Sequence, residues 1–132
     1  SYFTKQYGVI DEIYSMCRGI SKHVENKQYS DLVDIVGITP IIAPKYIIEQ
    51  GLFKQEKKCD IKYGFASVSL WIDYDEYLKA DITDKQIMIV KNILASIKTI
   101  SRKAKIDYKQ FCEDIFQYCK LINLPIESNL KV

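Results

Sequence analysis

Regular alternation of apolar and polar residues predicts a strand in the middle of the chain. From Ala66 to Tyr74 every second residue is apolar, and the residues between them are serine, tryptophan or aspartate. A period of two places these two sets on opposite faces of a sheet. Residues 59–63 alternate in the same way just upstream, and Gly64 follows them. We therefore predict a strand at Phe65–Tyr74 that pairs with the upstream strand in an antiparallel hairpin, with its turn at Gly64.

Helical periodicity predicts three longer helices. Apolar residues recur at spacings of three and four in residues 9–26, 84–101 and 107–122, as expected for helices with one buried face. Either Thr83 or Asp84 is expected to cap the second helix, and Asp107 to cap the third, because short polar side chains satisfy the free amides of a first turn. Pro125 is expected to stop the third helix.

Shorter segments complete the predicted fold. Tyr2–Thr4 suggests a small edge strand, and Ser30–Val36 a short helix with Ser30 as its N-cap. Ile38–Pro44 is apolar but contains two prolines, which predicts an edge strand or an irregular buried segment. A helical turn is expected at Asp75–Lys79.

Together these elements predict an α+β fold, in which a small, mostly antiparallel sheet packs against N-terminal and C-terminal helices. The length of 132 residues and the lack of a linker-like stretch indicate a single domain over residues 1–132, with a loose tail from about residue 125. No apolar run approaches the roughly 18 residues that span a bilayer, and no export signal is visible. These features favour a cytoplasmic location.

The residues offer little material for catalysis or for a cofactor. His23 is the single histidine and stands among polar residues, so we expect an exposed helix position. The sequence contains no glycine-rich nucleotide-binding motif and no nucleophile elbow. Four cysteines show no CxxC pair and are expected to be reduced thiols; they are Cys17, Cys59, Cys112 and Cys119. We therefore predict neither an enzyme nor a bound cofactor or metal.

Acidic side chains cluster directly after the predicted strand. The cluster contains one basic residue, Lys79, and its acidic members are Asp73, Asp75, Glu76, Asp81 and Asp84. Three interpretations remain open: helix capping, a partner-binding surface, and a site for a hard cation. The spacing does not match an EF-hand. Trp71 lies beside the cluster as either a binding anchor or a residue covered by the N-terminal helix.

Basic residues form a second charged feature, because Lys54, Lys57, Lys58 and Lys62 fall in the strand before Gly64. Such lysines can contact nucleic-acid phosphates, or they can prevent edge-to-edge association of the sheet. The overall charge is only +2, which gives no strong attraction to nucleic acid as a whole.

Several motifs resemble the immunity proteins of bacterial polymorphic toxin systems, particularly the immunity protein 44 family found beside contact-dependent growth inhibition toxins. The matching stretches are Val24-Glu25-Asn26-x-x-Tyr29, Thr39 to Pro44, Trp71 to Tyr74, Tyr77-Leu78-x-Ala80-Asp81, Asn92 to Ile97, and Phe111-x-x-Asp114-Ile115. In sequence order they cover most of the chain between about residues 9 and 116.

The resemblance implies a cytoplasmic immunity protein that binds and neutralises a cognate toxin domain, expected to be a nuclease, by occluding its active site or an exosite. Because a nuclease carries a basic groove, carboxylates on a rigid scaffold can imitate phosphates there. The expected contact residues are Asp73, Asp75, Glu76 and Asp81, with Trp71 and Tyr77 as aromatic anchors. The alternatives are an exosite formed by the Lys54–Lys62 hairpin, and a nucleic-acid-binding or regulatory module that uses the same hairpin.

Overall fold

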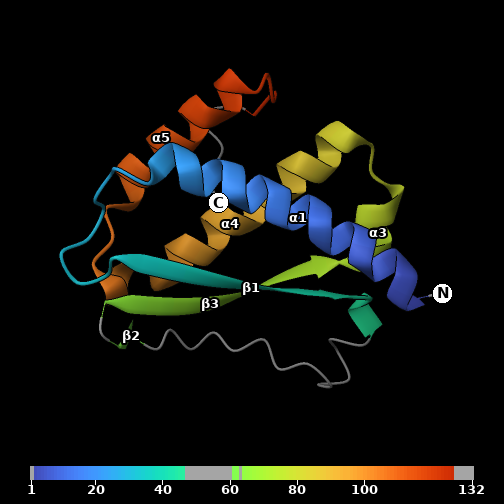
Figure 1. Cartoon of the computed structure of the whole chain (residues 1–132), viewed down its shortest axis with the longest axis horizontal. Coiled ribbons are helices and arrows are strands. Elements are labelled where there is room, and N and C mark those ends of the chain that lie inside the picture. The colour runs from blue at the N-terminus through green and yellow to red at the C-terminus, as the bar shows by residue number, and fades with distance from the viewer. Residues whose placement is uncertain (1, 47–60, 63, 127–132) are drawn as a thin grey trace.

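A computed structural model of the chain describes residues 2–46, 61–62 and 64–126 (Figure 1). The elements are α1 (Tyr2–Val24), β1 (Ile35–Ala43), β2 (Ile61–Lys62), β3 (Phe65–Asp73), α3 (Tyr74–Lys79), α4 (Ile82–Ala104) and α5 (Tyr108–Leu121). Figure 1 shows α1, α4 and α5 on the same side of the sheet that β1 and β3 form. This arrangement confirms helices packed on a small sheet.

The main pairing of the sheet is parallel, which corrects the prediction of a mostly antiparallel sheet. The strand order is β1-β3-β2, and β1 runs parallel to β3 from the pair Ile35–Phe65 to the pair Ala43–Asp73. The short β2 is antiparallel to β3, as the predicted hairpin requires. Residues 44–64 connect β1 to β3, and a connection of that length can return the chain for a parallel pairing. Sequence alternation locates strands but does not identify a distant partner.

Gly64 joins the hairpin to the beginning of β1. Its φ of 77° lies in the left-handed region, which a residue without a Cβ adopts at little cost. Its carbonyl accepts hydrogen bonds from the backbone N–H groups of Asp34 (2.8 Å) and Ile35 (3.2 Å). The predicted turn residue therefore also fixes the point at which β1 enters the sheet.

The hydrophobic core lies between the helices and one face of β3. Ala66, Val68 and Ile72 are buried on that face, as the alternation predicts, and each long helix contributes apolar residues at the predicted spacing. Helical core residues among the described residues include Ile13, Met16 and Ile20 of α1, Ile89, Val90, Ile93, Leu94, Ile97 and Ile100 of α4, and Phe111, Ile115 and Cys119 of α5. Burial of each large aliphatic side chain stabilises the fold by about 1.5–3 kcal/mol.

Two short N-terminal predictions are wrong. Tyr2–Thr4 belongs to α1, not to an edge strand. Ser30–Val36 forms no helix, although the Ser30 hydroxyl does accept hydrogen bonds from the N–H groups of Leu32 (3.0 Å) and Val33 (3.2 Å). The turn stops there because Ile35 and Val36 pair with β3 instead. The prolines of the following segment fit an edge strand, and β1 is at an edge of the described sheet.

The ends of the C-terminal helices are set by aspartates. Asp81, rather than Thr83 or Asp84, caps α4 and accepts a hydrogen bond from the N–H of Asp84 at 2.8 Å. Asp107 caps α5, as predicted. α5 ends at Leu121, four residues before Pro125. Of the tail predicted to be loose from about residue 125, Ile126 packs against the core, and residues 127–132 lie outside the described residues.

Cys17, Cys112 and Cys119 are free thiols in the structure, and Cys59 lies outside the described residues. Burial raises the pKa of Cys119 to about 11. Across the described ranges, no helix has the combination of length and apolar character needed to cross a membrane.

Candidate functional site

The predicted acidic surface lies where β3 passes into α3 and α3 into α4. We call it the acidic rim; it consists of Asp73, Asp75, Glu76, Asp81 and Asp84. Asp73 is the N-cap of α3, and its carboxylate accepts hydrogen bonds from the N–H groups of Asp75 (3.0 Å) and Glu76 (3.2 Å). The side chains of Asp75 and Glu76 are exposed. The rim therefore combines two capping aspartates with exposed carboxylates on the first turns of two helices.

Tyr77 is not an exposed anchor, which corrects the prediction for this residue. It has no exposed surface, and its hydroxyl donates a hydrogen bond of 2.6 Å to the carboxylate of Glu12. Burial, together with the hydrogen bond and negative charge of Glu12, raises the pKa of Tyr77. Tyr77 therefore attaches α3 to α1 and holds the acidic rim in position.

Leu78 and Ile82 are the exposed apolar residues beside the rim, with 41% and 72% of their surface accessible. The sequence interpretation missed them because it assigned the aromatic residue of this segment to the surface. The signal that identifies the buried face is the spacing of Tyr74 and Tyr77, which are three residues apart and both buried. Their common helix face points into the core, and Leu78 follows outside it.

Trp71 is half-buried, and its place in the sheet argues against the predicted cover by the N-terminal helix. Its neighbour Ile72 faces the helices, so the alternation of the strand places Trp71 on the opposite face. The indole N–H donates a hydrogen bond to the carbonyl of Ala43 at 3.2 Å. Trp71 therefore joins the ends of β1 and β3, and the N-terminal helix lies on the other side of the sheet.

The Lys54–Lys62 hairpin is described only in part. Lys54, Lys57 and Lys58 lie outside the described residues, and Lys62 is placed only by its backbone in β2. Within the described part of the chain, no group of three or more histidine, cysteine, aspartate or glutamate side chains is arranged to hold a metal ion.

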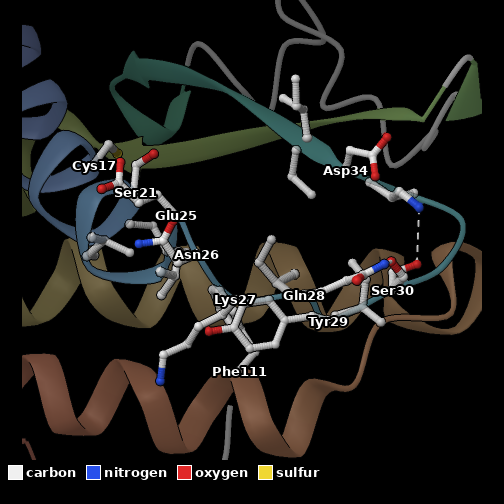
Figure 2. Close-up of a pocket in the computed structure, with 18 of the residues that line it drawn as sticks. Cys17, Ser21, Glu25, Asn26, Lys27, Gln28, Tyr29, Ser30, Asp34 and Phe111 are labelled. Carbon is white, nitrogen blue, oxygen red and sulfur yellow. Dashed lines mark hydrogen bonds between the residues drawn. The ribbon is translucent and has the colours of Figure 1, made fainter.

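A groove of about 680 Å³ forms a second candidate site, at the opposite end of the sheet from the acidic rim. Figure 2 shows it between the C-terminal end of α1, the segment 25–34 and the first residues of β1, with α4 and α5 beneath. Its aliphatic lining includes Ile20, Val24, Val33, Val36, Ile93 and Ile97. Sequence reasoning missed this groove because its walls come from segments far apart in the chain.

Asp114 fixes the segment that forms the groove wall. Its buried carboxylate accepts hydrogen bonds from Tyr29 (2.6 Å), Lys27 (2.9 Å) and Gln110 (3.1 Å). Burial alone raises the pKa of Asp114, but these hydrogen bonds and the charge of Lys27 outweigh it and hold the pKa below its usual range. The N–H of Asp107 also donates to the carbonyl of Tyr29 at 2.7 Å.

The serine of the same segment makes a further attachment. The Ser30 hydroxyl donates a hydrogen bond of 2.6 Å to the carbonyl of Ala104, the last residue of α4. The segment is therefore bound to α4 and α5 by several hydrogen bonds, which gives the groove a defined wall.

His23 is half-buried, contrary to the expected exposed position. Its ring lies 5.4 Å from that of Tyr118, measured between centroids. The Nε2 atom is buried without a hydrogen-bond partner among the described residues. The polar neighbours that suggested exposure face outward, whereas His23 faces α5.

Comparison with known proteins assigns the chain to a family. A family model of immunity protein 44 matches residues 1–120. The chain belongs to the immunity protein 44 family. No curated protein and no solved structure matches it.

The two sites place the immunity protein 44 motifs in three dimensions. Val24, Glu25, Asn26 and Tyr29 all line the groove, and Tyr29 is hydrogen-bonded to Asp114 of the closing motif. The Trp71–Tyr74 and Tyr77–Asp81 stretches contain the two capping aspartates of the acidic rim, Asp73 and Asp81, and part of α3. In this member of the family, the Val24–Tyr29 motif therefore meets the distant Phe111–Ile115 motif at the groove. The motifs at the rim are neighbours in the sequence.

Proposed function

We propose that this member of the immunity protein 44 family binds a cognate toxin domain of a contact-dependent growth inhibition system and neutralises it in the cytoplasm. The observation that carries the proposal is the family match over residues 1–120. An immunity protein of this kind acts by binding, so the proposed activity needs a stable complementary surface and no catalysis.

We further propose that the toxin domain is a nuclease and that the acidic rim occludes its basic groove. Asp75 and Glu76 are exposed, so their charge is available to a partner. Asp73 and Asp81 are fixed as helix caps, so they hold one geometry before binding. Complementary charge speeds encounter with a basic partner and disfavours other partners.

Apolar and aromatic groups beside the rim would supply the contact area that charge alone does not. Leu78 and Ile82 are exposed there, and Trp71 lies at the same end of the sheet with its indole held by Ala43. Interfaces gain most of their affinity from a few such anchors surrounded by polar residues. Tyr77 lies beneath this surface and supports it by attaching α3 to α1 through the hydrogen bond to Glu12.

The test is co-expression of the tagged chain with the C-terminal domain encoded immediately upstream of it, followed by affinity purification and a nuclease assay. We expect a stoichiometric complex and loss of nuclease activity. Recovery of nucleic acid with no protein partner would contradict the proposal and would favour the Lys54–Lys62 hairpin as the active surface.

A charge-reversal pair locates the interface. Asp75→Lys with Glu76→Lys changes exposed side chains that are not caps, so the expected cost to folding is limited to the charge–dipole interaction of the first turn of α3, about 0.3–1 kcal/mol per residue. The matched control is Asp31→Lys with Glu113→Lys, which alters the net charge equally at exposed positions away from the rim. We expect the rim pair to weaken binding by about tenfold or more and the control pair to weaken it far less. Equal effects would assign the interface to another face.

A further inference from the structure

We propose that the groove between α1 and the segment 25–34 receives an arginine or lysine side chain of the cognate toxin domain. The inference rests on the proposed function and adds a second contact to the acidic rim. It is argued from the shape of the groove, its charges and the rigidity of its wall.

The lining of the groove suits a long side chain with an apolar stem. Its floor is aliphatic, with Val24 and Val36 partly buried and Val33 buried. The methylene groups of lysine and arginine pack against such surfaces while the charged head stays at a polar edge. Tyr14, which also lines the groove, is 42% exposed and offers a ring for a guanidinium to stack on.

Negative charge at the α1 end of the groove favours a cationic head. Figure 2 shows Glu25 at this end, whereas Asp34 stands at the β1 end with its carboxylate beside Gly64. Both side chains are exposed, and among the described residues neither makes a hydrogen bond or an ion pair through its carboxylate. The nearby ammonium of Lys27 is directed to Asp114 instead, at 2.9 Å.

The end of α1 adds to this preference. The helix has 23 residues and ends at Val24, directly beside Glu25. Free carbonyls at a helix C-terminus carry partial negative charge and favour a cation within the last turn. The backbone dipole and Glu25 therefore act in the same direction at this end of the groove, where Lys22 is the charged basic residue of the last turn.

The wall of the groove is ordered before a partner arrives. Tyr29 and Ser30 are held by Asp114 and by the carbonyl of Ala104. A preformed site avoids the entropic cost of ordering a loop on binding. β1 and β3 each have nine residues, so the β1 end of the groove lies about 30 Å from the rim along the strands, and Tyr14 at the other part of the groove is closer to the rim. A typical interface patch of about 800 Å² per partner is about that wide, so one toxin domain can contact both.

The test measures the affinity of purified variants for the C-terminal domain encoded immediately upstream. Ser21→Trp fills the groove from an exposed α1 position, and Glu25→Lys reverses its charge. The matched controls are Ser15→Trp and Glu113→Lys, at exposed positions that lie outside the segment 25–34 and do not line the groove. We expect the groove variants to bind about tenfold more weakly or worse, with the controls within about threefold of the wild type.

The toxin side of the contact is identified by alanine substitution of its exposed arginines and lysines. One of these should weaken binding to the wild type while having little further effect on Ser21→Trp, because the two changes remove the same contact. Exchange of that residue for glutamate should restore affinity for Glu25→Lys.

The outcomes separate the two proposals. If the wild type binds the toxin domain and both groove variants bind equally well, the groove inference is overturned and the immunity function stands. If the wild type itself does not bind, both proposals fall. Circular dichroism is used to check that each variant is folded. If Ser21→Trp proves unstable, Glu25→Lys alone tests the proposal.

Discussion

Replacement of Asp114 by asparagine tests the attachment of the groove wall to α5. Asparagine has almost the same shape, but it carries no charge and replaces one acceptor oxygen with an NH₂ donor. In the native protein the two carboxylate oxygens accept from Lys27, Tyr29 and Gln110. After the substitution the NH₂ group can donate to the Tyr29 hydroxyl, which also accepts, while Lys27 and Gln110 still donate to the remaining oxygen. All three hydrogen bonds then lose the negative charge of the carboxylate.

The expected cost follows from these contacts. A hydrogen bond to a charged group contributes about 1.5–3 kcal/mol and a neutral one about 0.5–1.5 kcal/mol, so each of the three bonds weakens by roughly 1 kcal/mol. The ion pair adds little, because the side chain of Lys27 is 39% exposed and solvent screens such pairs. We expect Asp114→Asn to lower the free energy of unfolding by about 2–3 kcal/mol. The melting temperature should fall by about 6–12 °C.

The pH dependence gives a second, independent readout. Because the folded protein holds the pKa of Asp114 below its usual range, the unfolded state takes up this proton first as the pH falls. The carboxylate therefore contributes its full stability above its unfolded pKa of about 4. That contribution is lost as the pH falls through the lower folded value. Urea denaturation followed by circular dichroism at pH 7, 5 and 3 measures both quantities.

Tyr29→Phe supplies the partner for a double-mutant cycle. It removes the 2.6 Å hydrogen bond to the Asp114 carboxylate, and we expect a cost of about 1.5–3 kcal/mol. The two substitutions should be non-additive by about 1 kcal/mol, since both break the same contact. The reasoning is refuted if Asp114→Asn costs under about 0.5 kcal/mol at pH 7, or if its cost is the same at pH 3 as at pH 7.

Three further outcomes are expected. Tyr77→Phe removes the hydrogen bond to Glu12 and should destabilise the protein by about 1 kcal/mol in urea denaturation; an unchanged midpoint would contradict the described attachment. Gly64→Ala should cost about 1–2 kcal/mol because φ is positive, and the added Cβ would lie 2.7 Å from the Asp34 carboxylate. Cys119 is buried with a pKa of about 11, so at pH 8 its thiolate fraction is about 200-fold below that of a free cysteine. Iodoacetamide should leave its peptide unmodified in native protein and alkylate it in urea, as mass spectrometry would show.

Local features of the fold were predictable from the sequence because their causes are local. The alternation of β3, the apolar face of α4 and the Asp107 cap each depend on a few neighbouring residues. The parallel pairing of β1 with β3 is different, since it depends on where a long connection returns the chain. The observed cap of α4 is Asp81 and not the predicted Thr83 or Asp84, because a run of polar residues offers several possible caps.

For the candidate sites, too, the sequence predicts what depends on neighbouring residues and not what depends on distant segments. The acidic rim is sequential, so its residues could be named from the chain, but the burial of Tyr77 depends on the helix face that Tyr74 selects. The groove could not be predicted, because Val24, Val36, Ile97 and Phe111 reach it from four separate elements. The sequence identified Glu25 and Asp114 only as parts of motifs. The fold shows that Glu25 lines the groove and that Asp114 holds the groove wall through Tyr29.

The attachment of residues 25–34 to α5 also has a consequence for biosynthesis. Lys27 and Tyr29 leave the ribosome long before Asp114, which follows them by 87 and 85 residues. Until α5 has been made, the segment lacks its hydrogen bonds to Asp107 and Asp114, and the groove has no fixed wall. A nascent chain therefore completes this face only after every other described element has been synthesised, so the finished protein, rather than its N-terminal part, is the form that presents the groove to a partner.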